Sequence, residues 1–159
     1  MPQKPKRMTR KEASDDLVKY GEDMANANRP KEALDAFNRA IEMYPKNDYA
    51  WGDRALMLEK QGDVDEALAS FSNALSINPD NPITWNNKGL AFLKLKKTIQ
   101  AIECFDKAIE NDGDYAKALY NKGRALTLSG KTNESQECFN KARKLDPLLF
   151  TKLKKMKWD

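Results

Sequence analysis

The residue types that most often carry out chemistry are scarce in this chain of 159 residues, which has no histidine and two cysteines. Without histidine, the chain lacks the commonest general acid–base group, the usual activator of serine and cysteine nucleophiles, and the commonest metal ligand. Cys104 and Cys138 alone cannot complete a structural zinc site. We therefore expect no cofactor and no metal, and carboxylate chemistry is the catalytic option considered next.

Carboxylate catalysis would need several acids clustered in a pocket with shifted pKa values. The acids of this chain are spread along its length instead, so we expect no enzymatic activity. The stretch TWNNKGLAF at residues 84–92 poses a question of binding, because Asn86 and Asn87 stand side by side although asparagine is a poor helix former. Amide side chains both donate and accept hydrogen bonds, which suits them to a peptide backbone.

The net charge of +4 is unevenly distributed. The basic excess lies in residues 1–13 and 150–159, and the middle of the chain is net negative. A negative body is not typical of a nucleic-acid-binding surface. We find no apolar run long enough to span a membrane and no apolar segment after the basic N-terminus, so the expected location is cytoplasmic.

An internal repeat organises the sequence, with a period of 34 residues and no insertions. Asn87-Lys88-Gly89 returns as Asn121-Lys122-Gly123. Further columns at the same step hold Phe37, Phe71, Phe105 and Phe139; Ala40, Ala74, Ala108 and Ala142; and Gly21, Ala55, Gly89 and Gly123. The period defines four units, at residues 14–47, 48–81, 82–115 and 116–149.

Each unit is expected to form two helices, because its apolar and small residues recur at a spacing of three to four. Thr9 with Glu12 predicts a capping box that starts the first helix ahead of its repeat, and Asp63 with Glu66 predicts another in the second unit. Pro82 fits the first turn of a helix, where its missing N–H costs nothing.

The repeating columns are interpreted as packing positions. We expect the four phenylalanines, together with Trp51 and Trp85, in the core, and the small-residue column where two helices approach closely. Cys104 and Cys138 are interpreted as small, half-buried residues of adjacent units. A disulfide between them is not expected, because equivalent positions on stacked helix pairs usually lie farther apart than a disulfide allows.

The columns of Trp51, Ala67, Phe71 and Pro79 make the chain resemble the tetratricopeptide repeat family over residues 14–149. Lys88 stands where the family usually has leucine, and Gly113 stands where it has proline. The resemblance implies an all-α fold, a right-handed superhelical solenoid of antiparallel helix pairs (an α-α superhelix). It also implies a concave groove, lined by the first helix of each unit, that holds a peptide segment or a helix of a partner protein.

Helical periodicity indicates which residues face that groove. On the first helix of the third unit they lie opposite Trp85, with Asn86 at the border and Asn87 inside. Shifting this pattern by 34 residues gives the candidate peptide-binding residues: Tyr49, Asp53, Asn86, Asn87, Leu90, Lys94, Lys117, Tyr120, Asn121 and Arg124. Two alternatives stay open. The polar residues could be an ordinary solvated face, or the groove could clamp a chaperone tail, although only Asn87 and Lys117 match the five-residue clamp of such adaptors.

The two ends carry separate expectations. Residues 1–13 form a basic tail that we expect to be partly disordered. Residues 150–159 are expected to form a short capping helix. An apolar stripe within residues 148–158 consists of Leu149, Phe150, Leu153 and Met156. A short cap could leave apolar surface on the last unit, through which the chain could form a homo-oligomer. Contact of the same basic stripe with an anionic membrane is a weaker alternative.

The sequence as a whole therefore predicts a non-catalytic protein–protein interaction module or scaffold, which binds a peptide segment of a partner protein. The rival hypothesis is a structural protein that assembles with itself through the ends of its solenoid.

Overall fold

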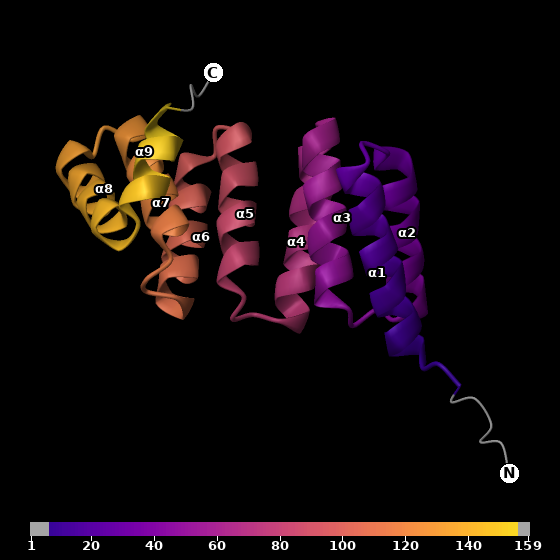
Figure 1. Ribbon diagram of the computed structural model, residues 1–159. Coiled ribbons are helices and arrows are strands. Elements are labelled where there is room, and N and C mark those ends of the chain that lie inside the picture. Colours follow the sequence, from indigo (N-terminus) through magenta and orange to yellow (C-terminus); the bar gives the residue numbers. More distant parts are fainter. Residues whose placement is uncertain (1–6, 156–159) are drawn as a thin grey trace, which may run out of the picture. The chain divides into compact units, whose positions relative to one another are not determined.

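The computed structural model describes residues 7–155, which form nine helices and no strand (Figure 1). The helices are α1 (Arg10–Asn26), α2 (Pro30–Met43), α3 (Asp48–Gln61), α4 (Val64–Ile77), α5 (Pro82–Lys94), α6 (Thr98–Asn111), α7 (Ala116–Leu128), α8 (Thr132–Leu145) and α9 (Pro147–Lys155). They pack as consecutive pairs, α1 with α2, α3 with α4, α5 with α6 and α7 with α8. The predicted all-α class of paired helices is confirmed.

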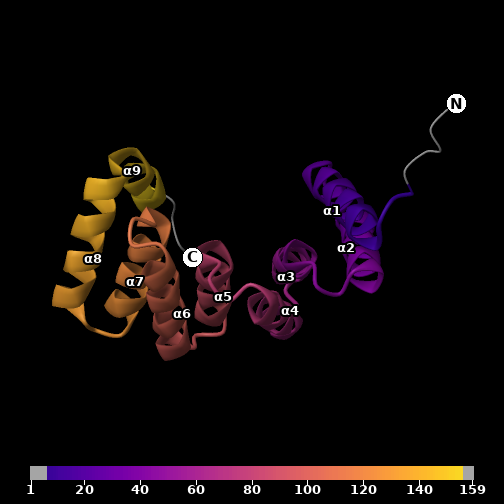
Figure 2. The same ribbon diagram turned by 90° about the horizontal axis from the view of Figure 1, so that it is seen from below.

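The chain divides into two compact units, which are described separately. The N-terminal unit, Met1–Asn78, holds α1 to α4, and the C-terminal unit, Pro79–Asp159, holds α5 to α9. Within the N-terminal unit α3 also contacts α1 and α2, and within the C-terminal unit α7 also contacts α5 and α6 (Figure 2). The first helices of neighbouring pairs therefore lie against each other inside each unit.

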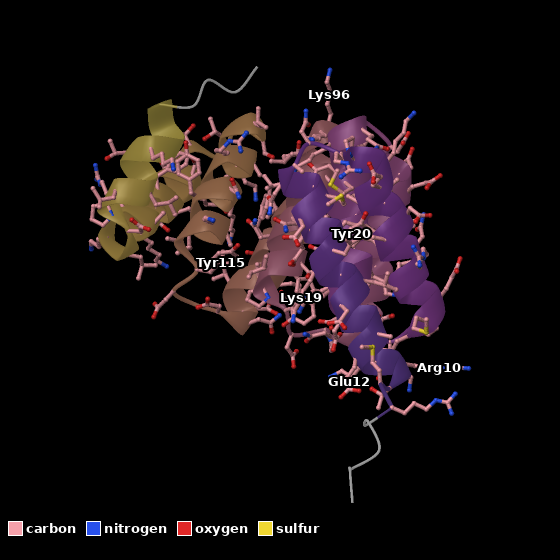
Figure 3. All side chains as sticks on the ribbon, turned by 45° about the vertical axis from the view of Figure 1, so that its right-hand side comes forward. Arg10, Glu12, Lys19, Tyr20, Lys96 and Tyr115 are labelled. Carbon is pink, nitrogen blue, oxygen red and sulfur yellow. The ribbon has the colours of Figure 1, made fainter. Side chains whose placement is uncertain are left out.

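Two of the three helix-start signals predicted from the sequence are confirmed. Thr9 and Glu12 form the predicted capping box at α1, where Glu12 N donates to Thr9 Oγ1 over 3.1 Å and Thr9 N to Glu12 Oε2 over 2.7 Å. Figure 3 shows Glu12 at the start of this helix, next to Arg10. Pro82 opens α5 as predicted. The capping box predicted at α4 is wrong, because the Asp63 side chain makes no cap hydrogen bond and Glu66 instead lies 3.4 Å from Arg54.

The small-residue column packs against the phenylalanine column. A Cβ added to Gly89 would lie 2.5 Å from Phe105 Cε1, and one added to Gly123 would lie 2.7 Å from the same atom of Phe139. A Cβ at either position would therefore require the phenylalanine ring to shift, as it must already be placed differently opposite Ala55 of the second unit. In the N-terminal unit Gly21 lies against Phe37 in the same way.

The tryptophans are not core residues, and that prediction is wrong. Trp51 and Trp85 are half-buried, whereas Phe37, Phe71 and Phe105 are fully buried. The indole N–H of Trp51 donates to the carbonyl of Pro45 over 3.0 Å, and that of Trp85 donates to the carbonyl of Pro79 over 2.7 Å. A tryptophan has a polar N–H that needs a partner, so these two hold the loop ahead of their helix and keep one edge in solvent.

The loop between the two helices of each pair contains a residue with a left-handed backbone conformation. These residues recur at the repeat period: Asn28, Gly62, Lys96 and Gly130. After each of them, the next backbone N–H bonds back to a carbonyl of the preceding helix, for example Lys97 N to Phe92 O over 2.9 Å. This is the bonding of a Schellman cap, for which glycine is the favoured residue. Lys96 is the one long side chain among the four.

The ends of the described chain extend the predicted units. Helix α1 begins at Arg10, inside the range predicted as a tail, and residues 1–6 lie outside the described part. Helix α9 begins at Pro147, earlier than the predicted 150, and packs on α8 and α7. The side chains of Phe150 and Leu153, and residues 156–159 altogether, lie outside the described residues, so the predicted apolar stripe stays a prediction.

Candidate functional site

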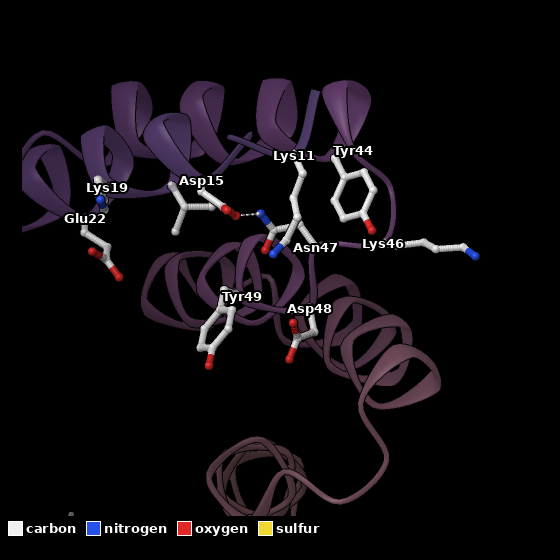
Figure 4. A pocket seen from close by; sticks show the side chains of 10 residues that line it. Lys11, Asp15, Lys19, Glu22, Tyr44, Lys46, Asn47, Asp48 and Tyr49 are labelled. Carbon is white, nitrogen blue, oxygen red and sulfur yellow. Dashed lines mark hydrogen bonds between the residues drawn. The ribbon is translucent and has the colours of Figure 1, made fainter. Parts of the chain in front are cut away.

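A groove runs along the first helices of the N-terminal unit and consists of two adjoining pockets. The larger, of about 440 Å³, lies between α1, α3 and the segment that joins α2 to α3 (Figure 4). It is lined by Lys11, Asp15, Val18, Lys19, Glu22, Tyr44, Lys46, Asn47, Asp48 and Tyr49. The smaller, of about 300 Å³, is lined by Glu22, Ala25, Asn26, Phe37, Asp53, Leu56, Met57 and Lys60. We call the two pockets together the α1–α3 groove.

A buried hydrogen-bond network fixes one end of this groove. Asn47 Nδ2 donates to Ser14 Oγ over 2.9 Å and to Asp15 Oδ1 over 3.0 Å, while Asn47 Oδ1 accepts from Ala50 N over 3.2 Å. Ser14 Oγ in turn donates to the carbonyl of Ala40. Because a buried polar network holds its members in one arrangement, the start of α3 is locked to α1 and the groove is preformed at this end.

Two carboxylates meet where the pockets join. Glu22 lines both pockets, and Asp53 lines the smaller one from α3. Burial, and secondly the charge of Glu22, raise the pKa of Asp53 from 3.8 to about 6. Neither carboxylate forms an ion pair with another residue of the described chain, although Lys19 and Lys60 also line the groove. The charge of the groove lining as a whole is balanced, with Lys11, Lys19, Lys46 and Lys60 against four acids, but no direct salt bridge within the described chain neutralises Glu22 or Asp53.

The C-terminal unit presents a row of amides instead of a charged groove. Asn121 Nδ2 on α7 donates to Asn86 Oδ1 on α5 over 2.9 Å, and Asn86 Nδ2 donates to Asn87 Oδ1 over 3.3 Å. Arg124 Nη1 reaches Asn121 Oδ1 over 3.4 Å. Asn86 and Asn121 are 3% and 6% exposed, so the row ties two helices together and only Asn87 and Arg124 are partly open to solvent.

These positions correct two predicted placements. Asn86 was expected at the border of the groove but is buried between helices. Tyr120 is 5% exposed, and its ring packs on Phe139 with centroids 5.3 Å apart. The physical reason is the same for both, because this helix position faces the neighbouring helix and not the solvent. Lys94 and Lys117 are exposed, and Leu90 packs partly buried on the cluster around Phe105.

The ten predicted residues thus fall into two groups. Tyr49 and Asp53 line the α1–α3 groove, and the other eight belong to the C-terminal unit. Glu22 lines both pockets but is not among the predicted residues. The sequence signal that could have indicated it is its negative charge, which it shares with Asp53 on the first helix of the next pair.

The cysteines have the properties of packing residues. Cys104 and Cys138 are both free and buried, more so than predicted. Burial raises the pKa of the Cys104 thiol to about 11, against a smaller opposing effect of Lys88, and burial also raises the pKa of Cys138. A thiol needs a lowered pKa to react as a nucleophile, so neither has the environment of a reactive cysteine. Among the described residues, no three His, Cys, Asp or Glu side chains gather as a metal site would require.

Paired helices that recur every 34 residues and pack by first helices define an α-helical repeat protein. Tetratricopeptide repeat models match residues 21–82, 82–115 and 116–149 in succession. The chain belongs to the tetratricopeptide repeat family. No curated protein matches it in sequence. Within residues 7–155, no helix combines the length and the apolar character that crossing a bilayer requires.

Several solved structures share the fold. MamA from Desulfovibrio magneticus RS-1 is 20% identical, over 84% of this chain and 76% of that chain, with a TM-score of 0.76. PilF of Pseudomonas aeruginosa is 21% identical, over 87% of this chain and 63% of that chain, with a TM-score of 0.81. PilW, a type IV pilus biogenesis factor, is 26% identical, over 84% and 62%, with a TM-score of 0.78. The chain thus spans less than two thirds of the length of PilF and PilW. These structural similarities support the fold.

Proposed function

We propose that the chain is a non-catalytic protein-interaction module, which binds a peptide segment of a partner protein on the surfaces formed by its first helices. The α1–α3 groove is the observation that carries this proposal. It is preformed by the Asn47 network, it has apolar walls, and Tyr49 stands 67% exposed at its side. An exposed aromatic beside a groove is a common feature of protein-binding surfaces.

The properties of the carboxylate pair favour binding over catalysis. Glu22 is exposed, so water reaches the pair, and no nucleophile with a lowered pKa accompanies it in the groove. The same two acids disfavour a nucleic-acid partner, since they would repel phosphates.

In the C-terminal unit, Asn87 is the amide of the row that is best placed for a peptide. Its Oδ1 accepts from Asn86, and its Nδ2 forms no hydrogen bond within the described chain. An outward amide donor can bond a peptide carbonyl whatever the sequence of the peptide. Exposed Lys117 on α7 could add charge for an acidic group of the same partner.

Peptide selection followed by binding measurements tests the proposal. Peptides selected from a random displayed library against the full chain should lose affinity for Asn87→Ala/Lys117→Ala or for variants of the α1–α3 groove. The matched control is Asn133→Ala/Lys141→Ala, which makes the same chemical changes at exposed positions of the second helix α8. If selected peptides depend on the α8 variant and on no first-helix variant, the proposed surface is wrong.

Self-assembly is the second candidate function, and an apolar surface at the end of the C-terminal unit favours it. Leu148 is 84% exposed and Leu145 is 43% exposed. Light scattering after size exclusion, over a wide range of protein concentration, tests this candidate. A monomer at every concentration would rule it out, whereas a concentration-dependent oligomer that Leu148→Ser dissociates would support it.

A further inference from the structure

We propose that the α1–α3 groove selects a partner segment with a lysine or arginine side chain, whose cationic end lies between the carboxylates of Glu22 and Asp53. This inference rests on the proposed function and specifies the chemistry of the partner. The groove alone could take many apolar segments. The two carboxylates at its centre are what restricts the choice, because each bound partner must either neutralise them or leave them desolvated.

A comparison of equivalent positions shows why Asp53 is left without a partner. In the C-terminal unit, the amide of Asn121 on α7 donates a hydrogen bond to Asn86 Oδ1 on α5. Two repeat periods earlier, the same two positions hold Asp53 on α3 and Val18 on α1. The side chain of buried Val18 has no polar atom, so the Asp53 carboxylate forms no hydrogen bond from α3 to this position of α1.

The second carboxylate follows the same comparison. The residue of the C-terminal unit that is equivalent to Glu22 is Leu90, and the residue equivalent to Asp53 is Asn121. Equivalent positions on the first helices therefore hold two acids in one unit and a leucine with a neutral amide in the other. Packing does not require acids at this place, since the fold accommodates both versions.

The shape and chemistry of the smaller pocket fit a long basic side chain. Ala25, Leu56 and Met57 form an apolar wall. The polar lining consists of Glu22, Asp53, Asn26 and Lys60, so two acids face one base in this pocket. Lysine and arginine bury an aliphatic stem along apolar surface and keep a charged end for a polar one. The volume of about 300 Å³ accepts such a side chain, while the larger pocket beside Tyr49 can hold the neighbouring residues of the segment.

Peptides from the display selection provide the test, with the full chain as the target. We expect sequences enriched in lysine or arginine. Replacing the basic residue of a selected peptide by norleucine, which keeps the stem and removes the charge, should weaken binding at least about tenfold, as for a lost hydrogen bond to a charged group. Glu22→Gln/Asp53→Asn should weaken binding of the original peptide by a similar factor. This variant should bind the norleucine peptide at least as tightly as the unmodified chain does, because no carboxylate is then left desolvated.

The control variant Asp16→Asn/Asp65→Asn makes the same change in net charge at two exposed positions outside the groove. It should bind like the unmodified chain, and circular dichroism should show that both double variants are folded. If the control and groove variants bind the original peptide equally, any loss of affinity comes from long-range charge, and the proposal is overturned.

The remaining outcomes separate this inference from the function on which it rests. Peptides that bind the groove with no basic preference, and equally well with norleucine, would overturn the inference and leave the proposed function standing. A selection that yields no peptide for any first-helix surface would overturn both. If a synthetic peptide of residues 150–159 binds with the same dependence on Glu22 and Asp53, the occupant is a second copy of this chain and not a partner.

Discussion

Asp53 should make the folded chain less stable at neutral pH than an uncharged residue would, so we expect Asp53→Asn to raise the free energy of unfolding. The side chain is largely withdrawn from water beside Glu22, and its pKa is raised from 3.8 to about 6. One pKa unit corresponds to about 1.36 kcal/mol, so the full effect is about 3 kcal/mol at pH 7. Since the groove is open, we expect a gain of about 1–3 kcal/mol from the neutral amide.

The dependence on pH gives the sign of this effect a second check. A carboxyl whose pKa is higher in the folded state binds more protons there than in the unfolded chain between pH 3.8 and about 6. Its contribution to stability is therefore fully present below pH 3.8 and is lost as the pH rises through about 6. The advantage of Asp53→Asn over the unmodified chain should grow across this interval and level off above it.

Urea unfolding followed by circular dichroism at several pH values between 4 and 8 measures both quantities. Asp16→Asn is the control, since Asp16 is exposed on α1 of the same unit and outside the groove, and its effect should stay within about 0.5 kcal/mol. The reasoning fails if Asp53→Asn is no more stable than the unmodified chain at pH 7. It also fails if the difference between the two does not change with pH.

Three further substitutions test the packing and the loops by thermal or urea unfolding. Lys96→Gly should stabilise by about 1 kcal/mol, because glycine adopts the left-handed φ of 57° without strain; no gain would mean that Lys96 makes a compensating contact. Gly89→Ala should destabilise by about 1–3 kcal/mol through the clash with Phe105, and a stabilised variant would show that the ring moves aside. Asn121→Ala should cost about 1–3 kcal/mol, because the Asn86 amide oxygen loses its donor; an unchanged stability would contradict the buried bond.

The sequence predicted the helix pairs well because their packing is repeated. The contact of glycine with phenylalanine, as at Gly89 and Phe105, places the same residue types at a fixed period, so a search for repeats finds it. The tryptophans show the limit of this reasoning. A recurring residue shows that the environment recurs, but not how far that environment is buried, and the indole hydrogen bond of Trp85 to the Pro79 carbonyl has no signature in the pattern.

The placement of the candidate residues was predicted less well, because a helical wheel describes one helix at a time. Viewed alone, α5 puts Asn86 at the border of the groove. Packed against α7, that border becomes an interface, and Asn86 is buried against Asn121. The column of left-handed loop residues was missed for a different reason. Its members share a backbone conformation and not a residue type. Gly62 and Gly130 suggest a left-handed position, but the lysine at position 96 does not, so the sequence alone did not reveal the column.

Positions that vary between repeats are where recognition can differ without a change of fold. The column that begins at Glu22 continues as Leu56, Leu90 and Arg124, so one place on the first helix is acidic, apolar and basic in turn. The phenylalanine column allows no such change, because each ring fills the space left by a small residue on the paired helix. The raised pKa of Asp53 predicts that its ionised carboxylate costs stability that an amide would not. We attribute this predicted cost to the proposed binding role of the groove, because the C-terminal unit folds with the neutral Asn121 at the equivalent position.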